Sequence, residues 1–156
     1  QHHDLRTVVA TAAERLRPQA VDASLTLEVE RAGEPLNVVV DADRIAQVVT
    51  NLVGNALRAT PAGGTVSVTC ARAGGDALVH IDDTGVGLEE SDLERVFERF
   101  YRVPGRSLDR TPGSGIGLTI ARRIVAAHGG SLSAASAGRD RGATFTMRLP
   151  LVAAPR

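Results

Sequence analysis

Residues 82–88 read DDTGVGL, and no other stretch says more about the architecture of this chain. The alternating run ALVHIDD at 77–83 leads into it, so Asp83 stands at the end of an expected strand. Gly85 and Gly87 permit a tight turn and a close approach to the backbone. A carboxylate at the mouth of such a turn either accepts a hydrogen bond from an exocyclic amine, such as that of adenine, or closes an Asx turn. Taken alone, the stretch leaves both interpretations open.

A helix is expected before this turn, over residues 42–60, with Asp41 as its N-terminal cap. Asn51 and Asn55 are four residues apart and share one face of it, and Arg58 falls on the same side. The opposite face is apolar and comprises Ile45, Val48, Val49, Leu52 and Ala56. An amide oxygen suits Mg²⁺ and a guanidinium suits phosphate. The alternative is a polar stripe that only faces water.

A second glycine pattern, GSGIGL at 113–118, opens an expected helix over 116–128. Free N–H groups at a helix start favour phosphate, although the pattern follows a loop and is not the dinucleotide-binding fingerprint. The preceding residues 101–115 are rich in Gly, Pro, Arg and Ser, which predicts a mobile loop. His128 lies in the last turn of the helix, where an imidazolium suits the helix dipole, so we expect it to have a structural role. Gly129 is expected to end the helix.

The remaining elements are predicted from periodicity and from turn residues. They are a helix at 5–16 with Pro18 shortly after it, strands at 24–30, 37–40, 65–72, 77–83, 131–136 and 143–150, and a short helix at 90–100. The order of these elements predicts a mixed sheet with helices packed on one face, an α/β sandwich.

Composition limits the possible functions. The 156 residues are 43% hydrophobic and carry no formal net charge, so we expect one ordinary domain without a nucleic-acid-binding surface. All eighteen basic residues are arginine, which excludes a P-loop because that loop needs a lysine. Cys70 is the single cysteine and favours a reducing compartment. No apolar run approaches the roughly 18 residues of a membrane span.

The order of the motifs resembles one family. An Asn-containing helix, Asp-x-Gly-x-Gly, FERFYR at 97–102 and Gly-x-Gly-x-Gly follow one another as in the ATP-binding catalytic domain of sensor histidine kinases. The resemblance extends over nearly the whole chain, including residues 4–20, 125–136 and 142–150. It implies the two-layer sandwich shared with gyrase, Hsp90 and MutL, in which helices cover one face of a mixed, mainly antiparallel sheet and a mobile lid covers ATP.

The resemblance also implies roles for individual residues. Asn55 would be the Mg²⁺ ligand, Asn51 a polar contact near the phosphates, Arg58 a replacement for a phosphate-binding lysine, and Asp83 the acceptor of the adenine amine. Further nucleotide-binding residues would be Ala59, Gly85, Gly87, Leu88, Tyr101, Arg102, Gly113, Ser114, Gly115, Ile116, Gly117, Leu118 and Thr144. Phe97 and Phe100 belong to the Phe-containing box beside the lid, and Ala59 stands where the family commonly has an aromatic residue.

The implied organisation is that of part of a sensor kinase. Residues 1–20 would be a lead-in segment, and residues 21–156 the ATP-binding domain. His3 is expected to be a surface residue and not the phosphoacceptor, because the 52 positions from His3 to Asn55 leave no room for a second long helix. The acceptor would lie on a separate dimerisation hairpin, with onward transfer to an aspartate of a response regulator. We expect a monomeric cytoplasmic domain whose parent is membrane-anchored.

Two alternatives belong to other functional classes. A serine kinase or ATPase of the same superfamily would carry an acid four residues before the metal-binding asparagine, and this chain has Asn51 there, which cannot act as a general base at neutral pH. A non-catalytic binding module is the other alternative, and the presence of Asn55, Asp83 and the lid glycines argues against it.

Overall fold

A computed structural model describes residues 1–99, 101 and 117–154 of the chain. Five strands form the main sheet in the order β2-β4-β5-β7-β6, and a two-stranded sheet pairs β1 with β3. The strands are β1 His2–Asp4, β2 Thr26–Val29, β3 Asn37–Val39, β4 Thr65–Ala73, β5 Asp76–Asp83, β6 Ser131–Ala135 and β7 Ala143–Pro150. The α-helices are α1 Leu5–Glu14, α2 Arg17–Asp22, α3 Ala42–Ala59 and α4 Gly117–Ala127.

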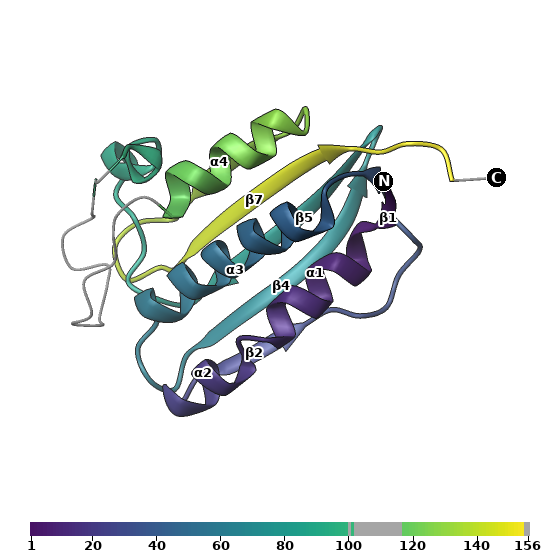
Figure 1. The fold of residues 1–156 in the computed structure, drawn as a ribbon. Coiled ribbons are helices and arrows are strands. Elements are labelled where there is room, and N and C mark those ends of the chain that lie inside the picture. Colours follow the sequence, from purple (N-terminus) through teal and green to yellow (C-terminus); the bar gives the residue numbers. More distant parts are fainter. Residues whose placement is uncertain (100, 102–116, 155–156) are drawn as a thin grey trace.

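The main sheet is mixed, as the sequence predicted. β2 runs parallel to β4, and the pairs β4–β5, β5–β7 and β6–β7 are antiparallel. The helices lie side by side over one face of the sheet, with α3 between α1 and α4 (Figure 1). Every second residue of β5, from Ala77 to Asp83, is buried toward these helices. The expected α/β sandwich is therefore confirmed.

Helix α3 occupies the centre of the helical layer. Its start is capped by Asp41, whose side-chain oxygen accepts hydrogen bonds from the backbone N–H groups of Asp43 and Arg44. The predicted apolar face is fully buried, with all five of its residues at 0% exposure: Ile45, Val48, Val49, Leu52 and Ala56. Burial of this face fixes the rotation of α3 and hence the direction in which Asn51 and Asn55 point.

Residues 1–40 contain structure that the sequence did not predict. His2 to Asp4 form β1 and pair antiparallel with β3, so His3 lies opposite Val38 in a ladder. A second short helix, α2, follows α1, and Pro18 lies in its first turn, where a missing N–H group costs no hydrogen bond. The lead-in segment is thus packed as part of the domain.

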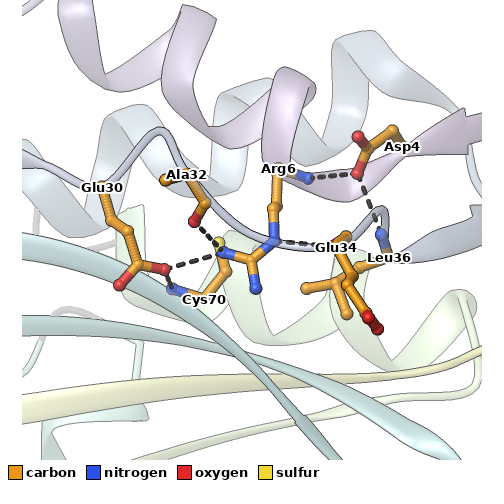
Figure 2. A network of polar contacts seen from close by, with 7 residues as sticks. All are labelled: Asp4, Arg6, Glu30, Ala32, Glu34, Leu36 and Cys70. Atoms are coloured by element: carbon orange, nitrogen blue, oxygen red, sulfur yellow. Dashed lines mark hydrogen bonds and ion pairs between the residues drawn. The ribbon is translucent and has the colours of Figure 1, made fainter.

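A network around Arg6 holds this lead-in segment on the sheet (Figure 2). The Arg6 guanidinium donates hydrogen bonds to the Glu30 carboxylate at 2.7 Å and to the carbonyls of Ala32 and Glu34 at 3.2 and 2.8 Å. The same Glu30 oxygen accepts the N–H of Cys70 on β4 at 3.2 Å. Burial raises the pKa of the Cys70 thiol to about 11. Arg6 thereby connects α1 to the β2–β3 loop and, through Glu30, to the sheet.

The prediction of one short helix at 90–100 was wrong. Two separate 3₁₀ turns, Glu90–Asp92 and Arg95–Phe97, occupy the described part of this segment. Its polar groups bond to neighbouring elements instead of continuing one helix: Thr119 of α4 donates to the Phe97 carbonyl at 2.8 Å, and Tyr101 donates to Asp92. Phe100 and the predicted mobile loop, except Tyr101, lie outside the described residues.

His128 has a structural role, as the sequence predicted. Nδ1 lies 2.7 Å from the carbonyl of Ile124, and Nε2 accepts the N–H of Asp41 at 3.1 Å. His128 thereby joins the end of α4 to the start of α3 as a hydrogen-bonding bridge. Gly129 ends α4 with φ +76°, as expected. Among the described helices, none is long and apolar enough to cross a membrane.

Candidate functional site

The polar face of α3 points toward α4. Asn51 and Asn55 are both half-buried, and the Asn51 side-chain N–H donates to the carbonyl of Gly117, the first residue of α4, at 3.1 Å. The Nδ2 atom of Asn55 is buried and has no hydrogen-bond partner within the described part of the chain. Such a group costs free energy unless a ligand or water satisfies it. Arg58 is exposed at the end of the same face.

The turn at residues 83–88, called the Asp83 turn below, lies against the C-terminal end of α3. Asp83 is 6% exposed, and its Oδ1 accepts the backbone N–H groups of Gly85 at 2.9 Å and Ala143 at 3.2 Å. Gly85 packs so tightly on α3 that an added Cβ would lie 2.1 Å from the carbonyl oxygen of Ala59. That carbonyl also accepts the N–H of Val86 at 3.1 Å. Asn55 precedes Ala59 by one helical turn, so the amide and the acid belong to adjoining elements.

A second loop, residues 136–142 between β6 and β7, encloses the turn from the other side. The N–H of Gly142 donates to the carbonyl of Gly85 at 3.1 Å, and the N–H of Asp140 donates to the carbonyl of Val86 at 2.7 Å. Gly87 has φ +71°, and a Cβ there would lie 2.1 Å from the carbonyl oxygen of Gly138. Both turn glycines are therefore required by close backbone contacts.

The described residues that border 102–116 are firmly packed. Phe97 is buried, meets Phe145 edge to face at 6.0 Å between centroids, and lies under the Arg122 guanidinium at 4.3 Å. The Tyr101 hydroxyl donates to Asp92 at 2.5 Å, and this bond to a carboxylate raises the pKa of Tyr101. Leu118 follows Gly117 in the first turn of α4 and packs against the core. Arg102, Gly113, Ser114, Gly115 and Ile116 lie outside the described residues.

Three predicted residues have other surroundings. Thr144 lies on the opposite face of the sheet from Asp83, because neighbouring strand residues point to opposite faces, and its hydroxyl donates to Asp82. The structure thus does not bring Thr144 into the cluster, and the neighbouring Ala143 contacts Asp83 instead. Leu88 is 2% exposed and belongs to the core, and the Ala59 side chain is buried as well.

Sequence reasoning missed the contribution of residues 136–142. Gly142 has φ +70°, and a Cβ on it would lie 2.1 Å from the carbonyl oxygen of Asp83. The only available signal was the turn-forming composition AGRDRG at 137–142, which predicts a loop but not the segment that the loop contacts. Ser136, at the start of this loop, gave no sequence signal at all.

A helix carrying two amides beside a glycine-flanked buried acid, on a helix-covered mixed sheet, defines the class of ATP-binding α/β sandwiches. The family model described as "Histidine kinase-, DNA gyrase B-, and HSP90-like ATPase" matches residues 40–153. The chain belongs to this family.

Similar proteins are sensor kinases. The sensor protein IrlS of Burkholderia pseudomallei is 38% identical over 98% of this chain, which covers 33% of IrlS. The mycobacterial sensor histidine kinase MprB superposes with a TM-score of 0.80 at 30% identity, over 97% of both chains. Full-length ShkA in complex with AMPPNP superposes with a TM-score of 0.81 at 25% identity, over 100% of this chain and 32% of ShkA. The chain thus spans about a third of the length of IrlS.

Proposed function

We propose that this domain binds ATP with Mg²⁺ and donates the γ-phosphoryl group to a histidine on a separate helical hairpin of a sensor kinase. The observation that carries the proposal is the buried, unpartnered Nδ2 of Asn55, close along α3 to the contact between Ala59 and the Asp83 turn. A buried amide N–H group without a partner among the described residues fits a position where a ligand oxygen, such as one of a phosphate, accepts the bond.

Different residues are proposed to contact the base and the phosphates of the nucleotide. Asp83 accepts the exocyclic amine of adenine, and Gly85 and Gly87 keep the backbone close enough for the base to reach it. Arg58 and Arg102 contact phosphate oxygens, for which a guanidinium is well suited. The glycines at 113, 115 and 117 let the lid backbone approach the phosphates.

Asn55 is the proposed ligand for Mg²⁺. Its amide oxygen is a hard donor of the kind this ion prefers, and its buried Nδ2 has no partner among the described residues, so it can donate to a phosphate oxygen. In the described part of the chain, no three His, Cys, Asp or Glu side chains gather into a metal site. When bound, the ion would screen the negative charge of the phosphates.

Transfer to histidine fits this site better than hydrolysis. Asn51 occupies the place where a water-activating acid would stand, and its side-chain N–H is committed to the Gly117 carbonyl. An amide cannot take a proton from water at neutral pH, so the domain positions the nucleotide and leaves the attacking group to its partner.

The acceptor hairpin and a response regulator are the partners of this proposal. Onward transfer takes the phosphoryl group to an aspartate of the regulator. Because ATP is supplied inside the cell, the domain works in the cytoplasm. We expect the isolated domain to be a monomer and to bind no nucleic acid.

Calorimetry with ATP, with and without Mg²⁺, tests the proposal. Wild type should bind ATP more tightly with Mg²⁺, and Asn55→Ala should lose most of that gain. Gln47→Ala, on an exposed position of α3, is the matched control and should behave as wild type. Absence of ATP binding by the wild type, or an unchanged Mg²⁺ effect in Asn55→Ala, would refute it.

A further inference from the structure

Ser136 directly follows β6, and in the part of the chain that the structure describes its hydroxyl bonds to backbone groups of two loops. Its Oγ accepts the N–H groups of Leu88 at 3.0 Å and Gly138 at 3.1 Å. It lies 2.6 Å from the carbonyl oxygen of Gly142 and 3.2 Å from that of Gly138. A hydroxyl has one proton and two lone pairs. The Ser136 hydroxyl donates its one hydrogen bond to the Gly142 carbonyl and accepts two, so all its hydrogen-bonding capacity is satisfied.

These bonds connect the two segments that hold Asp83. Leu88 ends the DTGVGL turn, and Gly142 directly precedes Ala143, one of the two N–H donors to Asp83 Oδ1. The other donor, Gly85, also accepts the Gly142 N–H through its carbonyl. Ser136 therefore contacts both segments that supply the N–H donors to Asp83: residues 83–88 through Leu88, and residues 136–143 through Gly142.

We propose that Ser136 is a positioning residue for adenine recognition, holding the Asp83 carboxylate in place through Leu88 and Gly142. This inference rests on the proposed function. Without the hydroxyl, the N–H groups of Leu88 and Gly138 and the carbonyl of Gly142 lose a shared partner. The two loops are then joined only by the Gly142–Gly85 and Asp140–Val86 backbone bonds among the bonds described above. The Asp83 carboxylate still accepts the Gly85 and Ala143 N–H groups, but these donors are held less firmly in place.

The ratio of ATP affinity to GTP affinity tests this role. Guanine has a carbonyl where adenine has its exocyclic amine, so a fixed carboxylate favours ATP and repels GTP. Ser136→Ala should lower ATP affinity about tenfold while leaving GTP affinity nearly unchanged, so the ATP/GTP affinity ratio falls by the same factor. Ser136→Thr keeps the hydroxyl and should restore the ratio. Ser133→Ala, at an exposed position of β6, is the control.

A merely structural role predicts something else. In that case Ser136→Ala would lower the melting temperature but change ATP and GTP affinity equally, and the proposal would be overturned. If Ser136→Ala does not fold, Ser136→Cys replaces it, because the thiol has similar shape and is a weak hydrogen-bonding group. A Cys variant with the wild-type ratio would equally overturn the proposal.

The proposed function can fail independently of this inference. If wild type binds no ATP, the proposed function is wrong. Hydrogen exchange of the Gly85, Leu88 and Ala143 amides without nucleotide then decides the role of Ser136. Faster exchange at these three amides in Ser136→Ala, with unchanged exchange in the middle of β4, supports the positioning role. Unchanged exchange at all of them refutes it.

Discussion

Asp82 and Asp83 are adjacent acids with opposite surroundings. Asp83 points toward the helices, is 6% exposed and is held by two backbone N–H groups. Asp82 points to the other face of the sheet and accepts the hydroxyl of Thr144. The two acids are neighbours on one strand but face opposite sides of the sheet, so they provide a pair for testing which acid recognises the base.

Asp83→Asn should weaken ATP binding while the fold is kept. A charged acceptor matched to an amine contributes about 1.5–3 kcal/mol, which corresponds to roughly a 10- to 150-fold loss of affinity. Titration calorimetry with ATP measures the change, and circular dichroism checks the fold. Asp82→Asn should bind ATP like the wild type. Equal losses in the two variants, or no loss in Asp83→Asn, would contradict the assignment.

Local periodicity was enough to predict how the candidate residues are oriented, but not which segments they contact. The spacing of Asn51 and Asn55 determined their common face on α3, and the alternation along β5 predicted the burial of Asp83. Ser136 and Ala143 reach the turn through the long-range register of β5, β7 and β6, which no local pattern contains. Thr144 shows the consequence, because a shift of one residue moves a side chain to the other face.

At the scale of elements, strong periodicity predicted the structure well and short segments were predicted poorly. The helices at 42–60 and 116–128 and the β4–β5 hairpin were found close to their expected bounds. The three-residue strand β1 exists only because β3 pairs with it. The described segment at 90–97 contacts α4, where Thr119 donates to the Phe97 carbonyl. Both depend on tertiary partners that override local propensity.

Arg6→Ala should destabilise the attachment of the lead-in segment. The Arg6 side chain is 14% exposed, and its removal leaves the Glu30 carboxylate with only the Cys70 N–H among its described donors and takes the Arg6 donor from the carbonyls of Ala32 and Glu34. We expect a loss of about 2–3 kcal/mol in the free energy of unfolding by urea denaturation. Arg31→Ala removes an arginine that is 66% exposed and should change it by less than about 1 kcal/mol. Similar losses in both variants would argue against a special role for Arg6.

Across the whole molecule, α3 separates the lead-in strand from the candidate site. His3 pairs with Val38, three residues before the Asp41 cap. Strand β1 therefore lies near the N-terminal end of α3 (Figure 1). Asn55 lies fourteen residues further along, which at 1.5 Å per residue is ~20 Å. Phosphoryl transfer requires the reacting atoms to come within about 3.5 Å, so His3 cannot reach a nucleotide bound at Asn55 of its own chain.

The last prediction concerns this separation. Incubated alone with radiolabelled ATP and Mg²⁺, the chain should bind nucleotide but gain no acid-labile phosphate, and hydrolysis should be slow because Asn51 cannot activate water. Adding a separately prepared acceptor hairpin from the parent kinase should place the label on the hairpin alone. His3→Ala should change neither result, since β1 contacts β3 through its backbone. Label that appears on the isolated chain and disappears in His3→Ala would identify His3 as an acceptor, and the phosphoryl group would then have to come from a second copy of the domain.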